Sequence, residues 1–191
     1  MTANTAPSAP PRVIITRPAQ QAPAWATALT EAGFDVALLP LIKIELLAPP
    51  AKLPNLADYD AVFLVSRNAL DGLLAWLGKA TLQTASCRFL CPGAGTAQAL
   101  RDLGISPSRI VQPAADAPQD SEHLWLTLQT PQTGQALPAG SSLLLVKGSD
   151  APHPAARPDT PNWLGQQASA QGVQVASINT YQRSAPELTV A

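Results

Sequence analysis

The sequence has few of the side chains that serve metal or nucleophilic chemistry. Its 191 residues include two cysteines and two histidines. Cys87 and Cys91 are four residues apart in one expected strand, about 13 Å at ~3.3 Å per residue, which is too far for a disulfide. Because His123 and His153 lie in unrelated segments, the spacing predicts no metal site and no serine–histidine pair. We expect both cysteines to be buried core residues in a reducing cytoplasm.

Charge is scarce as well. Charged residues make up 13% of the chain, and 12 Lys+Arg against 13 Asp+Glu give a formal net charge of -1. Broad binding to nucleic acid or to an acidic membrane requires a basic surface, so neither is expected, although one local anion pocket is compatible with this balance. No apolar run reaches the ~18 residues of a membrane-spanning helix. Residues 1–12 lack the apolar centre of a secretory signal, and we expect a disordered tail there in a cytoplasmic protein.

The remaining composition favours a folded α/β protein, since 46% of the residues are hydrophobic. Expected strands cover residues 13–16, 36–44, 61–65, 88–91, 109–112, 142–146 and 173–181, and expected helices cover 20–32, 68–77, 96–103, 121–129 and 162–171. Strands that alternate with helices predict parallel, doubly wound sheets. The first strand–helix–strand unit, residues 13–44, is too small to form a core alone.

Small polar turns follow three of the expected strands. They are Ser66-Arg67-Asn68-Ala69, Gly93-Ala94-Gly95-Thr96-Ala97 and Lys147-Gly148-Ser149. In an open α/β sheet such turns meet at the carboxyl ends of the strands, where ligands bind. Their backbone N–H groups and the helix dipoles favour anions, so we predict an anion-binding edge.

The same turns are also compatible with purely structural roles. Gln98 occupies the third glycine position of a dinucleotide fingerprint, so Gly93 and Gly95 are weak indicators of a nucleotide site. Both glycines are also typical of any tight strand-to-helix turn. Ser66 could simply cap its helix, as Ser121 could cap another, and both Tyr181 and Arg17 could be structural residues.

A set of short segments, taken in this order, resembles the uroporphyrinogen-III synthase family. The segments are Ile15-Thr16-Arg17-Pro18, Leu39-Pro40-Leu41-Ile42, Tyr59 to Ser66 with Asn68-Ala69, Pro92 to Ala97, Ser121-Glu122, Leu144 to Gly148, and Ile178 to Arg183. Each segment is weak alone, and the specificity lies in their order across residues 13–183. Two departures stand out: Val65 replaces the family's usual threonine, and no Gly-Arg pair follows Gly148.

The resemblance implies two doubly wound parallel-sheet α/β domains joined by a two-stranded linker. Residues 13–42 would open the split first domain, and residues 43–49 would form one linker strand. Residues 50–177 would form the inserted second domain, and residues 178–191 the returning strand. The first domain would be only partly present, because the returning half is missing and the chain resembles a truncated relative.

The resemblance also implies a reaction. The family dehydrates and cyclises hydroxymethylbilane, a linear tetrapyrrole with eight carboxylates, and inverts its last ring, with neither cofactor nor metal. Tyr181 would be the catalytic acid that helps the hydroxyl leave. Substrate-binding roles would fall to Arg17, Ser66, Gly95, Thr96, Lys147, Gly148 and Arg183. We expect a monomer.

Two alternatives from other functional classes accompany this expectation. The first is an inactive fragment or non-catalytic α/β module that keeps the anion-binding turns without the opposite wall of the cleft. The second is an unrelated two-domain binding protein of the hinge type, which a secretion signal would favour. Formation of the inverted isomer would separate a synthase from both.

Overall fold

A computed structural model describes residues 9–129, 136–150 and 162–187. The chain divides into two compact units, one made of residues 1–44 with 183–191 and the other of residues 45–182. Most of the expected tail, residues 1–12, lies outside the described residues. Among the described residues, none of the helices combines the length and apolar character that crossing a bilayer requires.

The smaller unit is one strand–helix–strand motif. Strand β1 (Arg12–Ile15) pairs in parallel with β2 (Asp35–Leu38), and helix α1 (Ala22–Glu31) connects them. Gly33, at φ 87°, ends the helix in a conformation that side chains disfavour. Apart from Ile15 and Ala22, the described residues of this motif are at least partly exposed, so its core is small.

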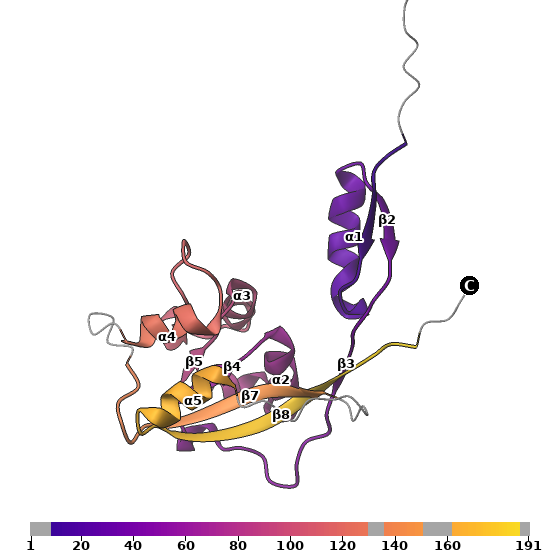
Figure 1. The fold of residues 1–191 in the computed structure, drawn as a ribbon. Coiled ribbons are helices and arrows are strands. Elements are labelled where there is room, and N and C mark those ends of the chain that lie inside the picture. The colour runs from indigo at the N-terminus through magenta and orange to yellow at the C-terminus, as the bar shows by residue number, and fades with distance from the viewer. Residues whose placement is uncertain (1–8, 130–135, 151–161, 188–191) are drawn as a thin grey trace, which may run out of the picture. The chain divides into compact units, whose positions relative to one another are not determined.

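A six-stranded sheet in the order β3-β8-β7-β4-β5-β6 lies mostly in the larger unit, and the first half of β3 and the last residues of β8 belong to the smaller one. These strands are β3 (Lys43–Leu46), β4 (Ala61–Leu64), β5 (Arg88–Leu90), β6 (Ile110–Val111), β7 (Ser142–Asp150) and β8 (Gln174–Ser184). Strand β4 pairs in parallel with both β5 and β7, and β5 pairs in parallel with β6. Figure 1 shows β7 and β8 running side by side as the longest strands.

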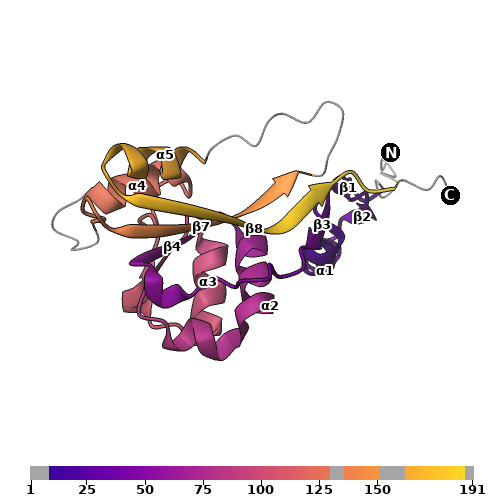
Figure 2. The same cartoon turned by 90° about the horizontal axis from the view of Figure 1, so that it is seen from below.

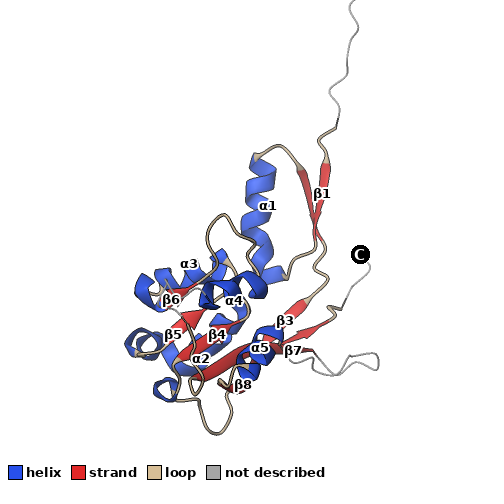
Figure 3. Cartoon of the chain, turned by 60° about the vertical axis from the view of Figure 1, so that its left-hand side comes forward, coloured by secondary structure: helices blue, strands red, loops and turns tan. Residues whose placement is uncertain are grey.

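Helices cover both faces of this sheet. They are α2 (Arg67–Thr84), α3 (Ala94–Asp102), α4 (Ser121–Gln129) and α5 (Trp163–Ala170). Figure 2 shows α2 and α3 on one side of the strands and α4 and α5 on the other, and Figure 3 shows the same helices around the sheet. The sequence-based prediction of an α/β fold with parallel strands is therefore confirmed. The finer division into domains stays a prediction.

The core explains why the central strands are uniformly apolar. All four residues of β4 are fully buried, as expected for a strand covered on both faces. One cluster packs Phe63, Leu143 and Leu145 against Leu124 of α4 and Leu164 of α5. The fixed centre of the sheet holds the strand ends, and therefore the turns beyond them, in defined positions.

Several expected boundaries were wrong. The strand expected at residues 36–44 is two strands in different sheets, β2 and β3, separated by Pro40, which has no N–H for a ladder. The helix expected at 68–77 runs on to Thr84 after a break at Gly78. The cap of α4 is the carboxylate of Asp120, which accepts from the His123 backbone N–H at 2.8 Å, and Ser121 is the first helical residue.

Candidate functional site

The first component of the candidate site is the turn from β4 into α2. Ser66 has an extended backbone and caps α2, with its side-chain oxygen accepting from the Ala69 N–H at 3.3 Å. The predicted capping role of Ser66 is therefore confirmed. The N-terminal end of α2, with its partial positive charge, therefore lies at the carboxyl end of the central strand β4.

The second component is Tyr181 on β8, whose hydroxyl lies 3.1 Å from the Ser66 Oγ. Either oxygen can donate in this hydrogen bond. Tyr181 is only 3% exposed. A Cβ at Gly148 would overlap the Tyr181 ring, so only glycine allows the ring to rest on β7 at this point. Ser66, Gly148 and Tyr181, which are far apart in the sequence, therefore meet.

The neighbouring residue of β8 also attaches to α2. Thr180 is fully buried, and its hydroxyl donates to the Ala69 carbonyl at 3.3 Å. A Cβ at Gly72 would come within 2.6 Å of the Thr180 Cβ, so glycine lets the helix and strand approach closely. Successive side chains of a regular strand point to opposite faces. Here both Thr180 and Tyr181 contact α2 or its capping residue, which fixes this part of the strand on the helix.

The turn from β5 into α3 lies beside the Ser66 turn, because β4 and β5 are neighbouring parallel strands. Gly93 is the capping residue, and the Thr96 N–H already donates to the Gly93 carbonyl at 3.1 Å. Thr96 is 5% exposed, whereas Gly95 is exposed and offers its backbone. Of the two predicted binding residues, Gly95 is therefore the better placed to meet an anion.

The third predicted turn does not exist as a turn. Lys147, Gly148 and Ser149 lie inside β7, because the strand continues to Asp150 rather than ending at Val146. Lys147 lines a cavity of about 400 Å³ between α5 and the sheet, together with Asn162, Gln166 and Ser177. Neither Ser66 nor Tyr181 lines that cavity. Lys147 therefore lies at the cavity beside α5, whereas Gly148 contacts the Tyr181 ring.

The two predicted arginines belong to the smaller unit. Arg17 follows β1 in the smaller unit and is exposed, and its guanidinium carbon lies 4.8 Å from the centre of the Trp25 ring. This distance is typical of a cation–π contact. Arg183 is an exposed residue near the end of β8.

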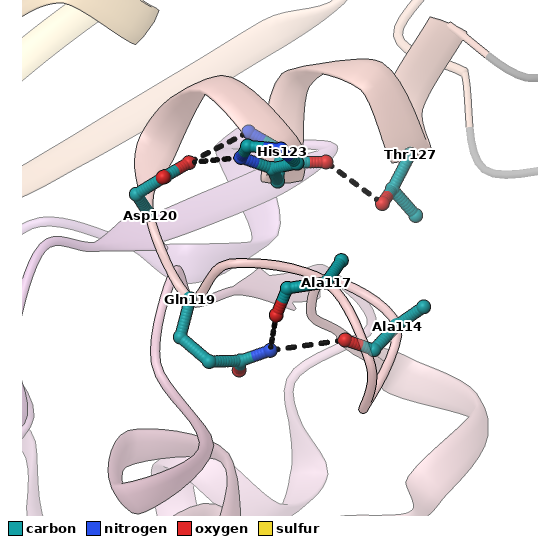
Figure 4. A network of polar contacts seen from close by, with 6 residues as sticks. All are labelled: Ala114, Ala117, Gln119, Asp120, His123 and Thr127. Atoms are coloured by element: carbon teal, nitrogen blue, oxygen red, sulfur yellow. Dashed lines mark hydrogen bonds and ion pairs between the residues drawn. The ribbon is translucent and has the colours of Figure 1, made fainter.

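The remaining titratable groups offer no competing centre among the described residues. Figure 4 shows the Asp120 carboxylate bonded to both the backbone N–H and the ring of His123, each at 2.8 Å, at the start of α4. The His123 backbone N–H, and then its ring, lower the pKa of Asp120, which is the behaviour of a capping carboxylate. In the part of the chain that the structure describes, no group of three or more His, Cys, Asp or Glu could hold a metal ion.

The two cysteines are buried and unbridged, as the sequence predicted. Burial raises the pKa of the Cys91 thiol to about 12 and raises that of Cys87 as well. Reactive cysteines need the thiolate at neutral pH. Both thiols are therefore structural.

Two residues of this arrangement have no role in the sequence-based expectations: Gly72 and Thr180. A glycine in the middle of an expected helix signals close approach of another segment, so Gly72 could have been found. The contact of Thr180 with α2 could not have been found from the sequence, because its partners are more than 100 residues away in the chain.

Comparisons with known proteins bear on the family and the fold of the chain. A family model described as uroporphyrinogen-III synthase HemD matches residues 23–190. A crystal structure of a mutant uroporphyrinogen III synthase from Thermus thermophilus shares 19% identity and a TM-score of 0.53, covering 92% of this chain and 64% of that one. A uroporphyrinogen-III synthetase from Helicobacter pylori shares 16% identity and a TM-score of 0.48, covering 83% of this chain and 60% of that one.

The likeness to the Thermus thermophilus structure shows a shared fold. The chain spans less than two thirds of the length of either solved structure. No curated protein sequence gives a significant match.

Proposed function

Because this chain belongs to the uroporphyrinogen-III synthase family, we propose that it converts hydroxymethylbilane to uroporphyrinogen III. The observation that carries the proposal is the match to the family model over residues 23–190. The meeting of Ser66, Gly148 and Tyr181 supports it, because it supplies a proton-bearing group beside an anion-binding helix end. We propose that the protein acts as a cytoplasmic monomer without a cofactor.

The proposed reaction releases one molecule of water. The terminal hydroxyl of the substrate leaves with a proton from a general acid, which gives an electrophilic azafulvene. The last pyrrole attacks through its substituted carbon to form a spiro intermediate, and bond cleavage and reclosure return that ring in the inverted orientation. The proton lost when the closing pyrrole regains aromaticity balances the one donated at the start.

The binding problem is electrostatic and entropic. A flexible substrate with eight carboxylates must be folded into one cyclisation geometry, and fixing orientation can supply much of the rate. The protein has a formal net charge of -1, so side-chain charge alone is poorly suited to that ligand. The N-terminal ends of α2 and α3 place their positive dipole ends, and the exposed backbone of Gly95, at one sheet edge. Arg17 and Arg183 are proposed as additional carboxylate partners.

Tyr181 is proposed as the general acid. A phenol is a weaker acid than a carboxylic acid, so we assign it a contribution at the lower end of the ~10²–10⁴-fold range of general acid catalysis. Its low exposure keeps bulk water from competing for the proton. The geometry of the folded substrate provides the larger share of the rate.

The decisive experiment is incubation of the chain with fresh hydroxymethylbilane, followed by oxidation and separation of the porphyrin isomers. We expect isomer III in excess of isomer I. Isomer I alone, formed at the rate of a protein-free blank, would contradict the proposal. Substrate binding without isomer III would instead identify a non-catalytic module of the same fold.

A further inference from the structure

We infer that Ser66 is a positioning residue for Tyr181: its hydroxyl orients the phenol and donates a hydrogen bond to the phenol oxygen as the proton leaves. The inference rests on the proposed function and gives Ser66 a role other than direct contact with substrate. It starts from the 3.1 Å separation of the two oxygens, which is within hydrogen-bonding distance.

The direction of this bond in the proposed step follows from the proton that Tyr181 gives to substrate, and the hydrogen-bonding capacity of Ser66 allows it. A hydroxyl has one hydrogen and two acceptor lone pairs. One lone pair of Ser66 Oγ already accepts from the Ala69 N–H at 3.3 Å. If the phenol hydrogen of Tyr181 points to substrate, the hydrogen of Ser66 is the one that can lie between the two oxygens. The phenolate that remains after proton transfer can only accept, so Ser66 keeps the same orientation throughout the step.

The ring of Tyr181 is restrained from several sides. It lies against the backbone of Gly148, where any Cβ would overlap it. The preceding residue, Thr180, is held by its hydrogen bond to the Ala69 carbonyl and by its close contact with Gly72. Ser66 supplies the remaining contact, which acts on the hydroxyl itself. Removing that contact leaves the ring in place but frees the direction of its O–H bond.

The position of Ser66 adds an electrostatic contribution. Ser66 caps α2, so the partial positive charge of that helix end lies beside the phenol oxygen. In the proposed step the O–H bond of Tyr181 breaks as the substrate C–O bond breaks, and the proton leaves in the water formed. The negative charge left on the phenol oxygen then faces the Ser66 hydrogen and the end of α2.

A set of variants separates this role from helix capping. Ser66→Ala removes both the cap and the donor, Ser66→Asp keeps a good cap but has no hydrogen to donate, and Ser66→Thr keeps both. We expect kcat for isomer III to fall about tenfold in the Ala and Asp variants, on the scale of a modest acid-catalysis effect, with KM within about twofold in the Ala variant. The Thr variant should remain within about threefold of the parent.

The Tyr181→Phe background provides the control for coupling. Because Ser66 is inferred to act through the phenol, Ser66→Ala should cause no further loss of kcat once Tyr181 is Phe. An equal loss in both backgrounds would overturn the inference, and so would a fully active Asp variant.

A measurement independent of turnover distinguishes failure of this inference from failure of the proposed function. The chain contains two tyrosines, so incorporation of 3-fluorotyrosine gives two ¹⁹F resonances, one from Tyr59 and one from Tyr181. Ser66→Ala should shift the Tyr181 resonance and leave that of Tyr59 unchanged. If isomer III is absent but this shift is seen, the pairing holds and the proposed function fails. If the Tyr181 resonance is unchanged, the inference is overturned whether or not the chain is active.

Discussion

Gly72 and Gly148 are required by close contacts and not by backbone conformation, since neither has a positive φ value. Because glycine has no side chain, Thr180 of β8 can approach Gly72, and Tyr181 of β8 can approach Gly148. At the scale of single residues, the placement of Tyr181, the proposed acid, therefore depends on the two glycines as much as on the hydrogen bond to Ser66.

Replacing Gly148 tests this placement. A Cβ there would overlap the buried Tyr181 ring, and overpacking of a core costs about 1–3 kcal/mol. We expect Gly148→Ala to lower the free energy of unfolding by that amount in urea denaturation and to abolish the Ser66–Tyr181 contact. Gly165→Ala is the matched control, because its Cβ would meet Leu145 at an ordinary 3.5 Å. Equal stability of the two variants would contradict the contact.

Arg17 offers a second test at this scale. Its guanidinium lies over the exposed ring of Trp25, and exposed cation–π contacts contribute about 0.5–1 kcal/mol. We expect Arg17→Ala to change unfolding stability by no more than that and to raise KM for hydroxymethylbilane, because a carboxylate partner is lost. Arg17→Lys should restore most of the KM. An unchanged KM in the Ala variant would mean that Arg17 contacts Trp25 but does not bind substrate.

At the scale of elements, hydrogen bonds join the amino ends of β4 and β7. They connect Asp60, which directly precedes β4, with Ser142, the first residue of β7. The Asp60 carboxylate accepts from the Ser142 backbone N–H at 2.8 Å and from its hydroxyl at 3.0 Å. These two hydrogen bonds, the backbone one first, lower the pKa of Asp60. The pair lies at the opposite ends of the strands from the turns of the candidate site, so it affects stability without touching the proposed chemistry.

This pair predicts a pH dependence of stability. A carboxyl whose pKa is lower in the folded state stabilises the fold above its unfolded pKa of ~3.9 and loses that contribution as the pH falls. We expect the urea midpoint of Asp60→Asn to fall less between pH 6 and pH 3 than that of the parent. At pH 6 the variant should be less stable by about 1 kcal/mol, a modest figure because the site is near solvent. Parallel pH curves for the two proteins would contradict the assignment.

At the scale of the whole molecule, the two units differ in how much core they contain. Among the described residues of the smaller unit, large apolar side chains such as Ile14 and Leu38 are 56% and 53% exposed. The larger unit buries the whole of β4 and most of β7. Local opening costs least where few apolar contacts are buried.

The two units should therefore open at different rates. We expect amides of β1, α1 and β2 to exchange with deuterium at least about tenfold faster than those of β4 and β7, because a two-stranded sheet with one helix is marginal alone. Hydrogen exchange with peptide-level mass spectrometry measures this directly. Equal protection of the two units would show that something outside the described contacts stabilises the smaller one.

The sequence by itself determined the elements and the class of fold. The β-branched and apolar runs of β1, β4 and β7, the expected helix at α4 and the capping role of Ser66 are local patterns, and local patterns reflect interactions within a few residues. It also carried the family resemblance, because the order of segments is a property of the chain alone.

Only the tertiary structure decided which residues meet. The contact of Tyr181 with Ser66 joins residues 115 apart, and strand pairing, which has no local signal, creates it. The same pairing extends β7 through Lys147 and Gly148, so that a stretch with the composition of a turn became the surface on which Tyr181 lies. Side-chain contacts across a sheet depend on the register of the strands and on how closely neighbouring elements approach one another. Both are properties of the assembled core.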